Sequence, residues 1–233
     1  DFAPMEFVDS SKDGQEQYVG LDVFLAKYIA DYIGVKLVIE PMSFDACQTA
    51  VYTASVPMSV SGYVWTEERA ESYEISDYYY DGDNKIEPVI LIRTADEEKY
   101  TSSEDFNGVD IGAQNASLQM QLVTSQLPDA NPVAVGDVGT GVLELQNGSI
   151  EALAVAKGNA EIIMDANPDL VLCPWEFTIT EETEAFVILI TKGETALLNV
   201  VNEALAKAYS EGMYGAWHDE AVALAKVVNG TEE

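Results

Sequence analysis

The run PVILIR, residues 88–93, and its near repeat FVILIT, residues 186–191, decide the fold that we expect. Each is a continuous apolar run rich in branched side chains, which is typical of a strand buried on both faces. Strands and helices alternate in the sequence before the first run and again between the two runs. We therefore expect an α/β protein of two lobes, with the second lobe, residues 89–189, inserted into the first, residues 1–88 plus 190–233.

If the two runs are adjacent strands that cross between the lobes, they form a two-strand hinge. A cleft would then lie between the lobes, and clefts at domain interfaces are where small molecules usually bind. The other elements follow from apolar periodicity and turn residues. Helices are predicted at residues 21–33, 44–54, 117–126, 140–146, 160–166, 195–210 and 217–228. Further strands are predicted at residues 36–40, 58–64, 109–113, 132–135, 151–155 and 170–173.

The composition excludes several classes of partner. The 233 residues carry 41 acidic side chains and 11 lysines and arginines, a formal net charge of −30. Nucleic acids and anionic membranes bind basic surfaces, so neither is expected as a partner. No apolar run approaches the roughly 20 residues that span a bilayer, so we expect a soluble protein. Cys47 and Cys173 have no metal-ligand spacing and are expected to be buried thiols.

The sequence contains no clear cofactor, metal or catalytic motif. Residues 136–141, GDVGTG, lack the lysine of a phosphate loop and are expected to start a helix capped by Thr140. Residues 81–84, DGDN, resemble a calcium site in composition but not in spacing. His218 is the only histidine, and no serine or cysteine nucleophile has a recognisable setting. We therefore expect neither a cofactor nor a catalytic triad.

Arg69 is one of only two arginines in this acidic chain, the other being Arg93. It follows a small-residue turn at Ser61 within SVSGYVWTEERAESYEISDYYY, residues 59–80. A guanidinium presents planar donors that can grip both oxygens of a carboxylate, so Arg69 is a candidate ligand-binding residue. The alternative is an ion pair with a neighbouring acid on a solvated surface, which is the common state of exposed charges.

Several short motifs, each occurring once, follow one another in an order that covers nearly the whole chain. They are FAPMEF at residues 2–7, YVGLDVFLAKYIA at 18–30, SFDA at 43–46, SGYVWTEERA at 61–70, SDYYY at 76–80 and NPDL at 167–170. Together they resemble the extracytoplasmic solute-binding proteins of ABC importers, in the branch that binds polar amino acids, bacterial solute-binding protein family 3. The resemblance implies a two-lobed, type II periplasmic-binding-protein-like fold that closes over a small carboxylate-bearing solute, such as an amino acid or a derivative.

The resemblance also implies a location and partners. A protein of this kind works outside the cell membrane, in the periplasm or on a lipid anchor, as a monomer that delivers its solute to an ABC transporter permease. In the first lobe, Arg69 would hold the solute's carboxylate and the Val64 N–H would support it, while the Ser61 carbonyl would face the ammonium. Tyr63 and Trp65 share a strand face and could frame an aromatic pocket, or belong to the lobe core.

The remaining candidates come from both lobes. Phe2 and Phe44 match positions that pack on the solute's side chain, although core packing is the alternative. In the second lobe, Ser117 and Leu118 open a helix whose N-terminus would complete the carboxylate site. Ser117 could instead be an N-cap without a ligand role.

The chain departs from the family pattern in three places. Ala156 occupies the position of the acid that binds the solute's ammonium, and Lys157 follows it. Either another group, such as Glu184 or a carbonyl, replaces that acid, or the solute is not an ordinary α-amino acid. Val64 replaces a hydroxyl residue near the turn. The family's first strand, and the acid that often follows it, would precede Asp1.

Two other functions fit the same fold. Relatives that resemble this family include cyclohexadienyl dehydratases, which use a carboxyl group in the cleft for acid–base catalysis. An enzyme of that kind would need an acid with a raised pKa in its cleft. A ligand-sensing module is the other alternative.

Overall fold

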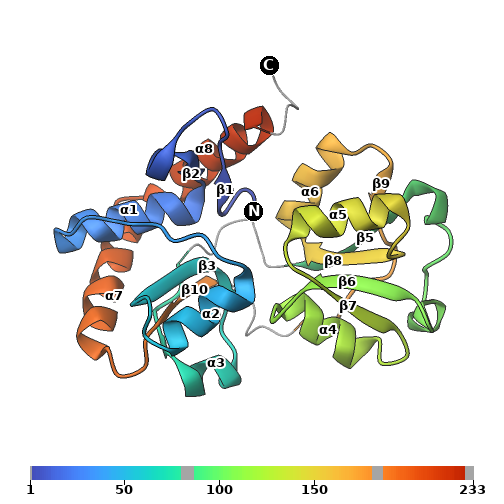
Figure 1. Ribbon diagram of the computed structural model, residues 1–233, viewed down its shortest axis with the longest axis horizontal. Helices are drawn as coiled ribbons and strands as arrows, with labels where there is room; N and C mark the ends of the chain where they lie inside the picture. Colours follow the sequence, from blue (N-terminus) through green and yellow to red (C-terminus); the bar gives the residue numbers. More distant parts are fainter. Residues whose placement is uncertain (1, 80–86, 180–185, 229–233) are drawn as a thin grey trace. The chain divides into compact units, whose positions relative to one another are not determined.

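The computed structural model describes residues 2–79, 87–179 and 186–228 (Figure 1). The chain divides into two compact units. Unit 1 consists of Ser43–Asp45 and Ile86–Thr180, together with Asp1, and unit 2 consists of Phe2–Met42, Ala46–Lys85 and Glu181–Glu233.

Unit 1 is built on a five-stranded sheet in the order β7-β6-β8-β5-β9. The strands are β5 (Pro88–Arg93), β6 (Asp110–Gln114), β7 (Asn131–Val135), β8 (Ala152–Ala156) and β9 (Leu170–Leu172). β6 runs parallel to β7 and β8, whereas β5 runs antiparallel to β8 and β9. The helices are α4 (Leu118–Gln126), α5 (Val138–Asn147) and α6 (Lys157–Ala166), with short 3-10 helices η2 (Thr94–Asp96) and η3 (Ser103–Phe106).

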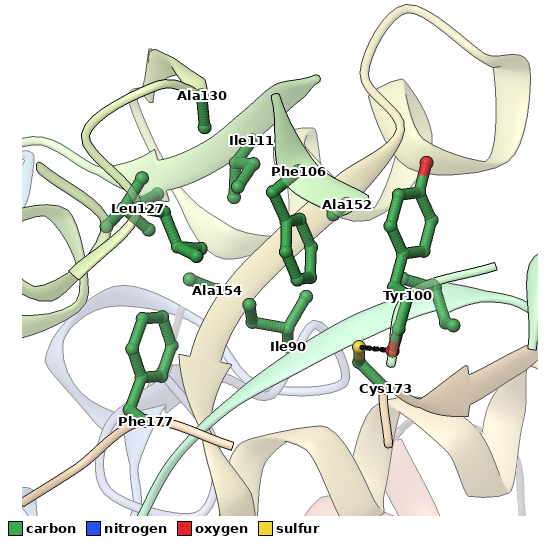
Figure 2. Close-up of a cluster of buried hydrophobic side chains, with 13 residues drawn as sticks. Ile90, Tyr100, Phe106, Ile111, Leu127, Ala130, Ala152, Ala154, Cys173 and Phe177 are labelled. Carbon is green, nitrogen blue, oxygen red and sulfur yellow. Dashed lines mark hydrogen bonds between the residues drawn. The ribbon is translucent and has the colours of Figure 1, made fainter. Parts of the chain in front are cut away.

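Alternation along the strands divides the core of unit 1 between the two faces of its sheet. Ile90 and Ile92 pack on one face with Val123 of α4, in a cluster that includes the stacked rings of Tyr100 and Phe106 (Figure 2). Leu91, between them, packs on the other face with residues of α5 and α6. Helices α4 and α6, which follow the parallel strands β6 and β8, therefore cover opposite faces.

Unit 2 contains a three-stranded sheet in the order β3-β10-β4, and the two outer strands are antiparallel to β10. Its strands are β3 (Met58–Val64), β4 (Glu74–Ile75) and β10 (Phe186–Ile190), with a separate hairpin of β1 (Phe7–Val8) and β2 (Tyr18–Val19). Its helices are α1 (Leu21–Ile33), α3 (Glu67–Ser72), α7 (Thr195–Ser210), α8 (Met213–Val228) and the 3-10 helix η1 (Gly14–Gln17). Helix α2 (Phe44–Tyr52) begins in residues grouped with unit 1 and continues in unit 2.

The structure confirms the α/β class and both apolar runs as strands, but it contradicts their pairing. β5 lies in the sheet of unit 1 and β10 lies in the sheet of unit 2, each between other neighbours. Both main boundaries of unit 1, at Ile86 and Thr180, fall among residues that the structure does not describe, as does the DGDN sequence at residues 81–84.

Other expectations need correction, and α6 and α8 also begin earlier than predicted, at Lys157 and Met213. Residues 36–40 form no strand in the described chain; the backbone of Ile39 hydrogen-bonds instead to the side chain of Gln15, at 2.6 and 3.1 Å. Helix α5 begins at Val138 rather than at Thr140, because the carboxylate of Asp137 accepts the Thr140 N–H at 2.8 Å and caps the helix. Neither cysteine is in a disulfide, and Cys173 is buried as expected, but Cys47 is half-exposed.

Candidate functional site

Arg69 is held in the interior of unit 2 by the turn between β3 and α3. Thr66 caps α3 by accepting the Arg69 N–H at 3.1 Å. The guanidinium donates from Nη1 to the Val64 carbonyl at 2.8 Å and from Nε to Gln48 Oε1 at 3.4 Å. Only 5% of Arg69 is exposed, and burial lowers its pKa. The solvated surface setting that was the alternative for this residue is therefore wrong.

The ring of Tyr63 supports the guanidinium of Arg69. The Arg69 Cζ atom lies 5.4 Å from the centre of that ring, a cation–π distance. Tyr63 is completely buried, and its hydroxyl forms a 2.9 Å hydrogen bond with the Ser59 hydroxyl. Burial raises the pKa of Tyr63, so this side chain is a neutral part of the lobe core. Trp65, just beyond β3, is half-buried.

The residues at Ser61 and Gly62 attach β3 to the N-terminal segment. The Ser61 hydroxyl donates to Glu6 Oε1, and the Gly62 N–H donates to Asp22 Oδ2 at 2.8 Å. Gly62 has a φ of +53°, and a Cβ atom there would lie 2.7 Å from Cε1 of the Phe2 ring. Phe2 therefore packs directly against β3 at the point where its register against β10 shifts, a position that only glycine fits without strain.

Glu6 and Asp22 form a buried pair of carboxyl groups that accept hydrogen bonds from Ser61 and Gly62 of β3. Asp22 is 1% exposed and also accepts the Tyr79 hydroxyl at 2.9 Å. Burial and the neighbouring Asp22 carboxylate raise the pKa of Glu6 well above its usual range, and burial raises the pKa of Asp22 to about 7. Among the described residues, the buried Glu6 Oε2 has no hydrogen-bond donor. The raised pKa values indicate that this pair retains a proton, and we expect the two carboxyl groups to share it.

In unit 1, the candidate residues lie at one edge of the sheet. The carboxyl ends of the parallel strands β6 and β8 meet there. The chain leaves β6 for β7 on one side and returns to β8 on the other side of β6. Such a reversal is where open α/β sheets usually bind ligands.

Two helices start at this edge. Ser117 caps α4 by accepting the Met120 N–H at 3.1 Å, and Leu118 is the first residue of the helix. Ala156 ends β8, and Lys157 begins α6. The Lys157 ammonium forms an ion pair with the carboxylate of Glu87, which precedes β5. Glu87 thus places a negative charge beside the uncharged Ala156.

No group of acids, cysteines or histidines in the described part of the chain could hold a metal ion. None of the helices in that part is long and apolar enough to cross a membrane.

Comparison with models of protein families shows which family this chain belongs to. The model of the bacterial extracellular solute-binding proteins, family 3, matches residues 1–221. The chain belongs to this family. A probable histidine-binding protein of Campylobacter jejuni is 24% identical over 91% of this chain and 78% of its own length. A putative ABC transporter arginine-binding protein of Escherichia coli is 24% identical over 91% of this chain and 84% of its own.

A solved structure agrees with the fold. The amino acid ABC transporter substrate-binding protein AbpA of Streptococcus pneumoniae, bound to L-arginine, matches with a TM-score of 0.86. It is 26% identical, and the match covers 97% of this chain and 92% of that one. The periplasmic-binding-protein-like fold expected from the sequence is confirmed.

The residues predicted for a family 3 binding site fall into separate groups. Arg69 contacts Val64, and Phe2 packs against Gly62, which follows Ser61 in β3. Ser117 and Leu118 belong to unit 1, as does Phe44, the half-buried first residue of α2. Glu184, a suggested replacement for the missing acid, lies outside the described residues. Contact of any of these residues with a solute stays a prediction.

Sequence reasoning missed three acids that the structure makes prominent. Glu6 lies within an apolar segment and Asp22 in the first turn of an apolar helix, and buried acids in such settings are a recognisable signal. Glu87 gave no such signal, because its proximity to Ala156 depends on how β5 pairs with β8.

Proposed function

We propose that this family 3 protein captures a free amino acid and delivers it to an ABC transporter permease. The observation that carries the proposal is the buried Arg69, whose guanidinium is oriented by the Val64 carbonyl and the Tyr63 ring. A fixed guanidinium binds a carboxylate through paired, charge-assisted hydrogen bonds. Removal of the carboxylate from water makes that interaction stronger than at the surface.

The class of amino acid follows from the relatives and from charge. The similar proteins are described as histidine- and arginine-binding, and AbpA holds L-arginine. The net charge of −30 favours the approach of cationic solutes, although salt screens exposed charge beyond about 8–10 Å. Arginine, histidine and lysine are therefore the first candidates. An extracytoplasmic location, at the outer face of the membrane or in a periplasm, accompanies this function.

A thermal-shift screen against the common amino acids, small amines and small carboxylates tests the proposal. A solute that binds only the folded protein raises its melting temperature. We expect a shift with at least one amino acid and none with the amines, which lack a carboxylate. A panel in which no amino acid shifts the melting temperature would refute amino acid capture. Small-angle X-ray scattering with and without that solute would test whether binding draws the two units together.

An enzyme remains the second candidate because of Glu6 and Asp22. Their raised pKa values are one of the two properties required of a dehydratase acid, the other being a place in the cleft. Their contacts favour a structural role instead, since Asp22 accepts hydrogen bonds from Gly62 and Tyr79. Incubation with prephenate or arogenate, followed by absorbance spectroscopy, distinguishes the two functions. We expect no product.

A further inference from the structure

Ala156 stands at the position where the family resemblance implies an acid that binds the solute's ammonium group. The edge of the sheet in unit 1 offers a replacement for that acid. We propose that Glu87 is the anionic anchor for the solute's ammonium group, and that Lys157 occupies this anchor until the solute displaces it. This inference rests on the proposed function. It assigns the solute a primary ammonium group, as in a free α-amino acid.

The strand register places Glu87 at the required position. Pro88, the first residue of β5, is paired with Ala156, the last residue of β8. Glu87 therefore lies beyond the end of β8, where its carbonyl accepts the Lys157 N–H at 2.8 Å. This is the edge at which the carboxyl ends of β6 and β8 meet and where the strand order reverses. Asp137 is another acid at this edge, just after β7, but its carboxylate already accepts hydrogen bonds from the backbone N–H and the hydroxyl of Thr140.

The ion pair shows what the site can bind. Lys157 Nζ is a primary ammonium group held on Glu87 Oε2, which is the interaction that an amino acid's ammonium would make. No residue in the described part of the chain donates a hydrogen bond to the other carboxylate oxygen, Glu87 Oε1. The side chains of Glu87 and Lys157 are each 42% exposed, so an incoming solute can reach them.

Exchange of one ammonium for another costs little. Ion pairs as exposed as this one contribute little to stability, so the loss of Lys157 from Glu87 is easily offset. A lysine at the first position of α6 also faces the positive end of the helix dipole, so its departure relieves a repulsion. Glu87 keeps a favourable position near that helix end whether its partner is Lys157 or the solute.

A purely structural role for the pair makes a different prediction, and substitutions separate the two. If Lys157 competes with the solute, Lys157→Gln tightens solute binding while Glu87→Gln weakens it. If the pair only braces β5 against α6, both substitutions change the melting temperature in the same direction and leave affinity unchanged. Lys207→Gln and Glu211→Gln provide matched controls. They make the same charge changes in an exposed ion pair between Lys207 of α7 and Glu211, the residue that follows this helix.

The experiment is isothermal titration calorimetry with L-arginine, or with the amino acid giving the largest thermal shift if L-arginine gives none. We expect Glu87→Gln to weaken binding about tenfold or more, Lys157→Gln to tighten it about threefold, and the double variant to bind as weakly as Glu87→Gln. The Nα-acetylated form of the same amino acid lacks the ammonium, so wild type and Glu87→Gln should bind it equally.

The outcomes separate this inference from the proposed function. Wild-type protein that binds the amino acid, with Glu87→Gln binding it equally well, overturns the role of Glu87 and leaves amino acid capture standing. Weaker binding by Lys157→Gln overturns the competitor role. Wild-type protein that binds no amino acid overturns the proposed function itself.

Discussion

The guanidinium of Arg69 is hydrogen-bonded to the carbonyl of Val64, 2.8 Å from Nη1. The donor and the acceptor lie five residues apart, on either side of the turn between β3 and α3. The hydrogen bond turns the long side chain back toward the end of β3 and fixes its direction. A fixed donor loses little conformational entropy when it binds a carboxylate, which is the property expected of a binding residue.

Replacement of Arg69 should remove most of the affinity for an amino acid. Arg69→Ala loses the charge partner of a desolvated carboxylate, a loss of about 3–5 kcal/mol, or a factor of 100 or more in Kd. Arg69→Lys keeps the charge but not the planar fork and should bind with intermediate affinity. Titration calorimetry measures both. Arg93→Lys, in which the altered side chain pairs with Asp96, is the control and should bind normally.

The Glu6–Asp22 pair should make stability depend on pH. Both carboxyl pKa values are raised in the folded state, so the folded protein holds protons that the unfolded chain releases above about pH 4. The free energy of unfolding should therefore fall from about pH 4 through about pH 7, where Asp22 is half ionised, and should go on falling while the two carboxyl groups finish ionising.

Glu6→Gln tests that dependence. Its amide can donate to Asp22 in place of the shared proton and still accept from Ser61. Denaturation across this pH range should show a smaller loss of stability for Glu6→Gln than for wild type. Glu67→Gln, at an exposed position, is the control. A profile for Glu6→Gln as steep as that of wild type would mean that the pair does not share a proton.

Gly62→Ala should destabilise unit 2 by two effects. A positive φ costs alanine about 1–2 kcal/mol, and the new Cβ would meet the Phe2 ring at 2.7 Å. Gly14→Ala has a similar φ of +61° but no atom within 4 Å of the Cβ position, so it reports the backbone cost alone. Chemical denaturation should show the larger loss for Gly62→Ala. Equal losses would mean that Phe2 moves aside freely.

Salt should stabilise the protein. A formal net charge of −30 produces repulsion in the compact state, and ions screen it. We expect the melting temperature to rise between about 0.01 and 0.15 M NaCl, over which the Debye length falls from about 30 to 8 Å. A melting temperature that is constant or falls would show that local ion pairs outweigh the net repulsion.

The sequence was sufficient for elements whose evidence is local. Helices α1 and α7 were predicted because their apolar residues recur at helical spacing, and Gly34 ends α1 with a φ of 80°. Both apolar runs were correctly predicted to be strands. Whether they pair with each other could not be predicted, because periodicity identifies a buried strand without identifying its neighbour. Residues 36–40 have a strand's composition, but a strand also requires a partner backbone.

The candidate site was predictable to a similar extent. Arg69 stood out because arginine is rare in this chain, whereas its burial depends on how Tyr63 and Gln48 pack around it. The Glu6–Asp22 contact joins two segments through the fold, and the Glu87–Lys157 pair depends on strand register. Contacts of that kind are properties of tertiary structure and leave no local pattern.

The central claim is that Arg69 binds the carboxylate of a free amino acid. Titration calorimetry of the wild-type protein with L-arginine and with L-argininamide tests it most directly. If another amino acid gives the largest thermal shift, that amino acid and its amide are used instead. The amide keeps the ammonium and the side chain but lacks the anionic carboxylate. We expect the amide to bind about 100-fold more weakly, or not measurably, because the guanidinium then faces a neutral group. Equal affinities for the acid and the amide would contradict the claim.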